Sequence, residues 1–428
     1  TDQITIRMKY LSSFLIQLII VLSAFSQPTF TFGDNNTNYP VLIKQDGSHS
    51  YILAQSDING TSYGTVTKIV TNTGMLVWQR RLDFPSQIND MVFIPPQGPL
   101  GRTSLYIVGH TLPFDANNAS FLIQINSESA ALECSNIFNQ TGRETFRKIV
   151  RNSNASNPNF PYFILGTRGY AGGATTQEKT TLINIKSGCS GGNNINFVKE
   201  YNFQNSPDIE FSRGLGVLND GSMLLLGNET TNGHGMVVKV NGAGNFVSSV
   251  VYTQNIEVLD AIELSNGNIL FSGKRTDNNV DAGLLFVTDG KLALLGQAFE
   301  NRNVLNYPKI ATNFLGDVYL PCFYKPAQNS NTTTFPLVQR LNIGGSNSNP
   351  LLSYTWQKSL ESTNNSLLYK GISLSADFGT ELIYTDGRSL TSNNLNISFA
   401  KTNPSFNTIC SDSITTFLRP VNLGFNSV

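Results

Sequence analysis

The chain has 428 residues, of which only 14% are charged, and its 29 basic and 29 acidic residues give no net charge. No run of lysine and arginine offers the phosphate-neutralising patch that nucleic-acid binding requires, so we exclude nucleic acid as a partner. With 36 glycines and few charges, solubility must come from neutral polar side chains, as is typical of an extracellular β protein.

Residues 8–26 have the layout of a signal peptide. Lys9 is the positive end, an apolar run covers residues 11–25, and residues 24–26 (AFS) form a small-x-small cleavage site before Gln27. Residues 1–7 are then interpreted as upstream sequence. The alternative is a transmembrane anchor, but the run is short and polar residues interrupt it. We therefore expect export to the medium or the cell surface, with no membrane span in the mature chain.

The stretch Leu215–Val247 contains the clearest repeating unit of the chain. An apolar strand, Leu215–Leu218, is followed by an Asn-Asp-Gly turn and by a second apolar strand that ends at Gly227. An alternating strand, Met236–Val240, precedes a last Gly-bearing turn and Phe246. Asn-Gly and Asp-Gly turns favour tight hairpins, so neighbouring strands should be antiparallel.

The small residue that closes the second strand of this unit recurs along the whole chain. It is found at Ala54, Gly109, Gly166, Gly227, Gly273, Cys322 and Thr385. A short apolar segment precedes each of these strands, at residues 41–43, 91–94, 148–150, 214–218, 260–264, 309–311 and 371–374. Stacked units of about 40 to 50 residues indicate propellers or solenoids. Fully apolar runs such as Met223–Leu226 favour strands that are buried on both faces.

The sequence therefore predicts an all-β fold, a seven-bladed β-propeller of four-stranded antiparallel blades, over residues 27–412. A β-helix is disfavoured by the hairpin turns, and a sandwich by the number of strands. We expect the N-terminal segment at residues 28–33 to supply the outermost strand of the seventh blade and so to close the ring. Residues 413–428 are interpreted as a tail, or as the start of a linker to a missing domain.

Three segments resemble the repeat of secreted propeller proteins that are common in Bacteroidota. These segments are residues 30–54 (FTFGDNNTNYPVLIKQDGSHSYILA), 64–82 (GTVTKIVTNTGMLVWQRRL) and 399–410 (FAKTNPSFNTIC). The resemblance implies export, often by the type IX route, surface residence and a C-terminal sorting domain. The chain departs from the pattern because only Trp78 and Trp356 keep the repeat tryptophan. It also lacks the sorting domain before Val428, which implies a natural short form or a fragment.

Linear motifs for catalysis are weak. Residues 375–380 (SADFGT) match the Asp-box turn of sialidase-like propellers, but an Asx turn explains that pattern without an enzyme. Glycosidases need two facing carboxylates. The candidates Glu229, Asp260, Glu263 and Asp281 stand in no recognisable context, so we expect them at strand ends and in loops. GxSxG is absent, and the Gly-rich pieces at residues 169–173 and 188–192 are interpreted as loops.

Metal and ligand signals are equally sparse. The four cysteines, Cys134, Cys189, Cys322 and Cys410, fit no metal pattern and allow one disulfide or none. His49, His110 and His234 are each expected in exposed loops, and no metal or cofactor is predicted. Exposed rings can stack on sugars or anchor a protein partner, but packing at blade rims is the favoured role for the aromatic residues near turns, which are Tyr63, Phe84, Phe114, Tyr170 and Tyr307.

Two functions remain open on the sequence. The first is a non-enzymatic, adhesin-like binding or scaffold module, expected to be monomeric, with a protein or glycan ligand. The second is a carbohydrate-binding or carbohydrate-active propeller, glycosidase- or sialidase-like, whose site is assembled from loops of several blades. No catalytic, cofactor-binding or metal-binding residue is assigned, and the ligand-binding residues are unknown.

Overall fold

The computed structural model describes residues 29–32, 37–96, 103–112, 119–138, 144–170, 177–188, 194–201, 210–229, 233–313, 315–325, 335–359, 372–375, 380–386, 396–402, 412–413, 418–421, 423 and 425–427. The signal peptide predicted at residues 8–26 lies outside these ranges. Every regular element within them is a β-strand. No helix among the described residues is both long and apolar enough to cross a membrane.

The described strands pair antiparallel into four sheets of four strands, one of five and one of nine, which we divide into groups called blades 1 to 7 in chain order. Blade 1 contains β2 (Thr37–Asp46), β3 (His49–Ile58), β4 (Thr61–Val70) and β5 (Leu76–Arg81). Blade 2 contains β6 (Ser86–Ile94), β7 (Ser104–Thr111), β8 (Ser120–Asn126) and β9 (Leu132–Phe138). Blade 3 contains β10 (Glu144–Arg151), β11 (Tyr162–Tyr170), β12 (Gln177–Ile185) and β13 (Ile195–Tyr201).

The remaining blades have the same order of strands. Blade 4 contains β14 (Glu210–Val217), β15 (Met223–Glu229), β16 (His234–Val240) and the first half of β17 (Phe246–Glu263). Blade 5 contains the second half of β17, β18 (Ile269–Asp277), β19 (Val280–Thr288) and β20 (Ala298–Asn301). Blade 6 contains β21 (Ala311–Thr312), β22 (Val318–Tyr324), β23 (Phe335–Ser346) and β24 (Asn349–Ser359). Blade 7 contains β25 (Ile372–Ser375), β26 (Thr380–Asp386), β27 (Asn396–Thr402) and β1 (Thr29–Phe32).

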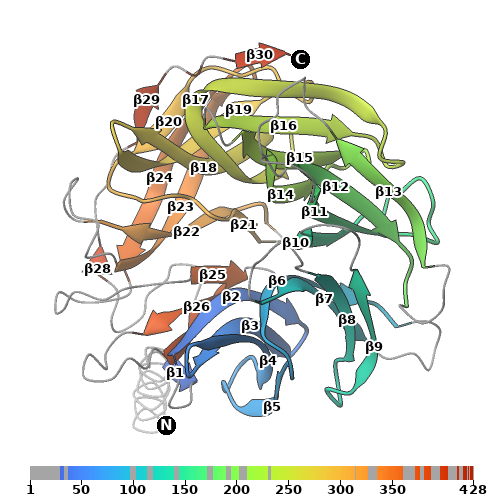
Figure 1. Ribbon diagram of the computed structural model, residues 1–428. Coiled ribbons are helices and arrows are strands. Elements are labelled where there is room, and N and C mark those ends of the chain that lie inside the picture. The colour runs from blue at the N-terminus through green and yellow to red at the C-terminus, as the bar shows by residue number, and fades with distance from the viewer. Residues whose placement is uncertain are drawn as a thin grey trace, which may run out of the picture.

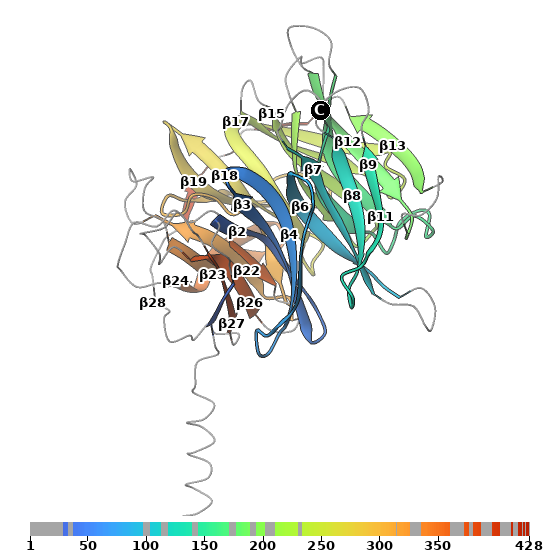
Figure 2. The ribbon, with the colours of Figure 1, turned by 60° about the horizontal axis from the view of Figure 1, so that its bottom comes forward.

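The blades are arranged in a ring (Figure 1). The first strands, such as β2, β6, β10 and β25, surround the middle, and outer strands such as β5, β9 and β13 lie at the rim. Blades 1 and 2 stand side by side in the turned view (Figure 2). The all-β propeller of four-stranded antiparallel blades is thus confirmed. Counting seven blades requires that the continuous strand β17 be divided between two of them. The number of blades therefore stays a prediction.

The hydrophobic core consists of layers between neighbouring blades. Leu224 and Leu226 pack with residues of blade 5, whereas Met223 and Leu225, on the opposite face of the same strand, pack with residues of blade 3. Successive side chains of a strand point to opposite faces, so a strand between two blades must be apolar at every position. This explains the run at residues 223–226.

The repeated small residue lies opposite a β-bulge in the first strand of its own blade. Gly109 pairs with Ile88, and the register shifts between Ile88 and Asp90; Gly273 pairs with Val258, and the register shifts between Val258 and Asp260. A Cβ at Gly109 would lie 2.2 Å from the Gln87 carbonyl oxygen, and one at Gly273 would lie 2.0 Å from that of Glu257. The recurrence therefore reflects the close approach of a bulged inner strand.

The N-terminal segment closes the ring, as predicted. Strand β1 pairs antiparallel with β27, with Phe30 opposite Phe399, and β25 and β26 contact β2 of blade 1. The last blade is therefore a sheet made from both ends of the chain, and contacts between its strands β25 and β26 and β2 join it to the first blade.

The C-terminal residues extend the outer edges of three successive blades. Strand β28 (Asp412–Ser413) pairs with β24, β29 (Arg419–Val421) with β20, and β30 (Phe425–Ser427) with β17. Leu418 packs against the core layer of blades 5 and 6, and Leu423 lies within that of blades 4 and 5. Most of the range interpreted as a tail is thus tied to the propeller.

The fourth strand of blade 5 is shorter than the apolar segment that contains it. This segment begins at Leu292, but β20 begins only at Ala298. The Asp289 carboxylate accepts the backbone N–H groups of Lys291 and Ala293, and Leu292 has a φ of 71°. An Asx-type turn thus replaces the first part of that strand.

Candidate functional site

The aromatic residues considered as ligand contacts pack against other side chains, and one of them is fully buried, where the structure describes their side chains. Tyr307 is fully buried and its hydroxyl hydrogen-bonds with that of Tyr354. Phe84 packs edge-on against Phe121, with ring centroids 5.4 Å apart, and Tyr63 lies under the Arg81 guanidinium. The side chains of Phe114 and Tyr170 lie outside the described residues. The packing role favoured for Tyr307 and Phe84 is confirmed.

The histidines and cysteines differ in part from expectation. His49 and His234 are partly exposed, but His110 is only 2% exposed and lies within hydrogen-bonding distance of Asn89. The expectation of an exposed loop is wrong for His110, because its strand β7 is covered on both faces. Cys134 forms a disulfide, whereas Cys322 is a free, buried thiol. Within the described ranges, no group of three or more His, Cys, Asp or Glu side chains could hold a metal ion.

The carboxylates considered for glycoside chemistry are not gathered in one place. Asp260 accepts the backbone N–H of Ile310 at 2.8 Å and so links blades 5 and 6. Asp281 pairs with Lys274 at 3.6 Å. The Glu229 side chain and residues 376–379 of the Asp-box match lie outside the described residues.

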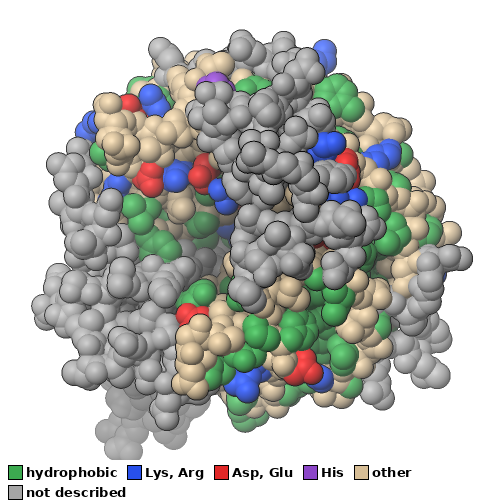
Figure 3. All heavy atoms as spheres, in the orientation of Figure 1, with side chains coloured by type: hydrophobic (Ala, Val, Ile, Leu, Met, Phe, Trp, Pro, Cys, Tyr) green, Lys and Arg blue, Asp and Glu red, His purple; other side chains and the backbone are tan. Residues whose placement is uncertain are grey.

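Basic and acidic side chains alternate beside the hollow at the middle of the face shown in Figure 3.

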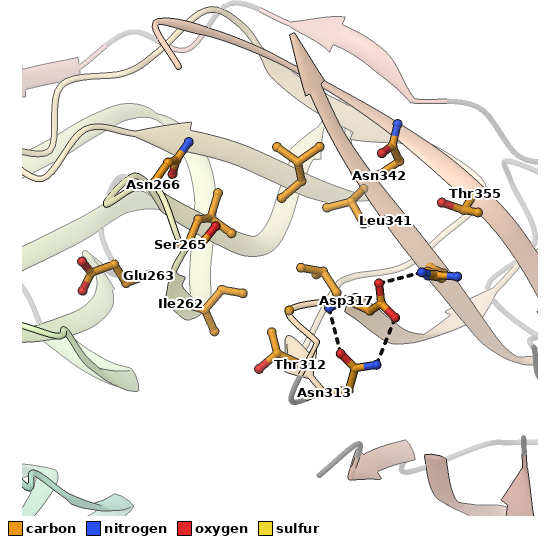
Figure 4. Close-up of a pocket in the computed structure, with 15 residues that line it drawn as sticks. Ile262, Glu263, Ser265, Asn266, Thr312, Asn313, Asp317, Leu341, Asn342 and Thr355 are labelled. Carbon is orange, nitrogen blue, oxygen red and sulfur yellow. Dashed lines mark hydrogen bonds and ion pairs between the residues drawn. The ribbon is translucent and has the colours of Figure 1, made fainter. Parts of the chain in front are cut away.

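Glu263 lines a pocket between blades 5 and 6 with a volume of about 480 Å³ (Figure 4). One wall is the β17–β18 hairpin, with Ser265 and Asn266, and the opposite wall is blade 6. The hairpin forms because Asn266 accepts the backbone N–H of Asn268, while Gly267 takes a φ of 81°. The volume falls in the range that holds a small ligand.

A network of charged groups on blade 6 forms the polar floor of the pocket. The Asp317 carboxylate accepts a hydrogen bond from Nη2 of Arg340 at 2.6 Å and another from Nδ2 of Asn313 at 3.0 Å. Figure 4 shows Asn313 and Asp317 facing each other. Partial burial opposes ionisation of Asp317, but the hydrogen bonds from Arg340 and Asn313 outweigh it and lower the pKa. Asp317 is therefore a fixed carboxylate and not a proton donor near neutral pH.

Several hydrogen-bonding groups of the pocket have no partner among the described residues. Arg340 uses only Nη2, which leaves the other N–H groups of its guanidinium unused. Ser265, Thr312 and Thr355 line the same space, and each has an exposed side chain with an unpaired hydroxyl. Apolar side chains complete the lining: Ile262, Leu264, Val318, Leu341 and Ile343. The pocket thus offers donors and acceptors beside aliphatic surface.

Two of these groups could have been found in the sequence. Arg340, in the third strand of blade 6 (VQRL), corresponds to Lys239 in the third strand of blade 4 (VVKV), and Asp317 directly follows the Leu315-Gly316 turn. The equivalent pair in blade 4 is Lys239 and Asp220, which are 3.6 Å apart. The recurrence marks an ion pair between a hairpin turn and a third strand.

Comparison with known proteins gives only distant structural likeness. No family model and no curated protein matches the sequence. The intramolecular trans-sialidase from Ruminococcus gnavus is similar over 90% of this chain and 96% of its own, with 8% identity and a TM-score of 0.44. The leech intramolecular trans-sialidase has 10% identity and a TM-score of 0.46, covering 90% of this chain and 71% of its own.

The β-propeller domain of the Trilobed protease from Pyrococcus furiosus is similar to the same degree. It has 10% identity and a TM-score of 0.43, covering 89% of this chain and 98% of its own. These neighbours have different activities and very low identity. We therefore draw no functional argument from them, and the function must be argued from the residues of the pocket.

Proposed function

We propose that the protein is an exported, non-enzymatic β-propeller that binds a neutral glycan in the pocket between blades 5 and 6. The observation that carries this proposal is the set of unpaired donors and hydroxyls around one cavity, formed by Arg340, Ser265, Thr312 and Thr355. A sugar presents alternating hydroxyl groups and aliphatic C–H faces. It therefore matches a lining that combines hydroxyls, a guanidinium and aliphatic side chains.

The charge of the lining favours a neutral sugar over an acidic one. Glu263 and Asp317 are acidic and Arg340 is basic, so the lining has a net charge of about −1 near neutral pH. Asp317 already pairs with the Arg340 guanidinium. A sugar carboxylate would compete for that guanidinium and meet two like charges, which disfavours binding.

Binding without hydrolysis is supported by the ionisation of Asp317. A glycosidase needs one carboxyl with a raised pKa as the general acid. The pKa of Asp317 is lowered, so Asp317 is not an acid of this kind. Glu263 accepts the backbone N–H of Asn219 from the neighbouring blade.

Export is supported by two independent features. Residues 8–26 have the signal-peptide pattern, and Cys134 forms a disulfide, which persists in oxidising compartments. N-terminal sequencing of the secreted protein tests this part of the proposal: we expect a mature chain that begins at Gln27, and recovery of the protein only in the reducing cytosol would contradict it.

A glycan array with neutral and acidic sugars tests the binding function. We expect saturable binding of neutral glycans. Thr355→Val and Thr312→Val should each weaken it by about 3- to 10-fold, because each removes one hydrogen bond at an exposed site. Thr253→Val, an exposed strand threonine outside the pocket, is the matched control. Equal binding by all variants, or turnover of a glycoside, would refute the proposal.

A further inference from the structure

Three lysines lie on or beside the first strands of separate blades, which surround the middle of the ring (Figure 1). Lys44 belongs to β2, Lys148 to β10, and Lys309 directly precedes Ile310 and β21. All three are partly buried. Burial, followed by the charges of Lys44 and Lys148, lowers the pKa of Lys309 to about 8, although Asp260 and Asp90 oppose this effect. Lys309 therefore lies within electrostatic reach of the other two lysines and of both aspartates.

The two aspartates of this cluster are already occupied. Asp90 accepts the backbone N–H of Ile149 at 3.1 Å, and Asp260 accepts that of Ile310 at 2.8 Å. In both cases the isoleucine directly follows a lysine of the next blade. The same contact, from an aspartate of one blade to a Lys-Ile pair of the next, therefore occurs twice around the ring. Lys44 lies 3.8 Å from Asp90 and donates to the carbonyl of Met91.

The other two lysines lack such partners. Among the described residues, neither Lys148 nor Lys309 forms a hydrogen bond or an ion pair within 4 Å. Gly214 holds the position after the bulge in blade 4 and adds no side chain there; a Cβ would lie 2.3 Å from the Leu259 carbonyl oxygen. Burial raises the pKa of Asp260, and the charge of Lys148, two blades away, opposes that rise.

We propose that the lysine cluster at the centre of the ring, formed by Lys44, Lys148 and Lys309, binds a singly charged oxyanion group of a ligand. With Asp90 and Asp260 both ionised, the three ammonium groups leave a net charge of +1, which one carboxylate or sulfate ester neutralises. The free donors of Lys148 and Lys309 supply charge-assisted hydrogen bonds to such oxygens. This site is separate from the neutral-glycan pocket and does not depend on it.

Calorimetric titration at constant ionic strength tests the site with two monoanionic probes, D-glucuronate and methyl sulfate, and with glucose as the neutral reference. We expect saturable binding of at least one anion at pH 7. The affinity should fall about 10-fold between pH 7 and pH 9, because Lys309 loses its proton in that interval. Glucuronate and methyl sulfate together distinguish a carboxylate site from a sulfate-ester site.

Matched variants assign the binding to these lysines. Lys309→Met and Lys148→Met should each weaken anion binding at least 10-fold, whereas Lys291→Met, on an exposed turn of blade 5, should bind as the unmodified protein does. Thr355→Val, in the glycan pocket, should also leave anion binding unchanged. Circular dichroism melts establish that each variant is folded. Absence of saturable binding of both anions, or unchanged binding in both lysine variants, would overturn the proposal.

Discussion

Gly273→Ala is the sharpest test of the bulge that organises each blade. The new Cβ would lie 2.0 Å from the carbonyl oxygen of Glu257 and 3.3 Å from the Cα of Val258. Both atoms are backbone, so no side chain can rotate away, and the inner strand must move by about 1.4 Å to restore an ordinary contact. Such a shift weakens the pairing of β17 with β18 on both sides of the bulge.

The expected cost follows from the overpacking and the lost pairing. Forcing extra atoms into a packed interior costs about 1–3 kcal/mol, and each weakened backbone hydrogen bond adds about 1 kcal/mol. Alanine has fewer backbone conformations than glycine in the unfolded chain, and this stabilises the folded protein by about 0.4–1 kcal/mol. We expect a net loss of about 3 kcal/mol. For a chain of 428 residues, this lowers the thermal midpoint by about 3–4 °C if the propeller unfolds cooperatively.

Thermal unfolding followed by circular dichroism measures this effect, with Gly290→Ala as the matched control. A Cβ at Gly290 would have its nearest neighbour at 3.9 Å, and Gly290 is not among the glycines with positive φ. The control should therefore melt within about 1 °C of the unmodified protein, as is usual for surface substitutions. If Gly273→Ala melts together with the control, the close approach of the Glu257 carbonyl does not require glycine at this position.

Two further predictions concern the ends of the chain. Deletion of residues 29–32 removes the partner of β27 and should lower the thermal midpoint by several degrees, since the loss opens an edge in the blade that closes the ring; an unchanged melt would show that β1 does not close it. Leu423→Ala should cost about 2–3 kcal/mol in urea unfolding, because Leu423 is only 6% exposed within the core layer of blades 4 and 5. Leu351→Ala, at a side chain that is 57% exposed, is its control, and equal stability of the two variants would contradict the anchoring role of Leu423.

The repeat could be read from the sequence because each blade needs the same local chemistry. Asn219 to Gly221 forms a hairpin turn, and the second strand is apolar on both faces because it lies between two blades. The reason for the small residue at Gly109 or Gly273 could not be read. It depends on a bulge in the preceding strand, and a bulge leaves no composition signal of its own.

The pocket could not be predicted, because its unpaired groups come from separate segments. Ser265 belongs to one blade, and Thr312 and Thr355 to two ends of the next. Their meeting depends on the register between the blades. The Asp317 and Arg340 pair does follow a recurring pattern, but its counterpart, Asp220 with Lys239, is structural. A shared pattern thus reports architecture, and only the unshared hydroxyls around it distinguish a ligand site.

The contrast between shared and unshared positions also explains which residues lie at the centre of the ring. The residue opposite the bulge is small in every blade that has this bulge: Ala54, Gly109, Gly166, Gly227 and Gly273. The residue after the bulge is instead Leu42, Asp90, Lys148, Gly214 or Asp260. The first position is fixed by the close approach of two backbones, whereas the second faces the next blade near the ring centre and is free to vary. The bulge therefore holds the fold constant while its following residue varies, and this variable position supplies Asp90, Lys148 and Asp260 to the charged groups at the centre.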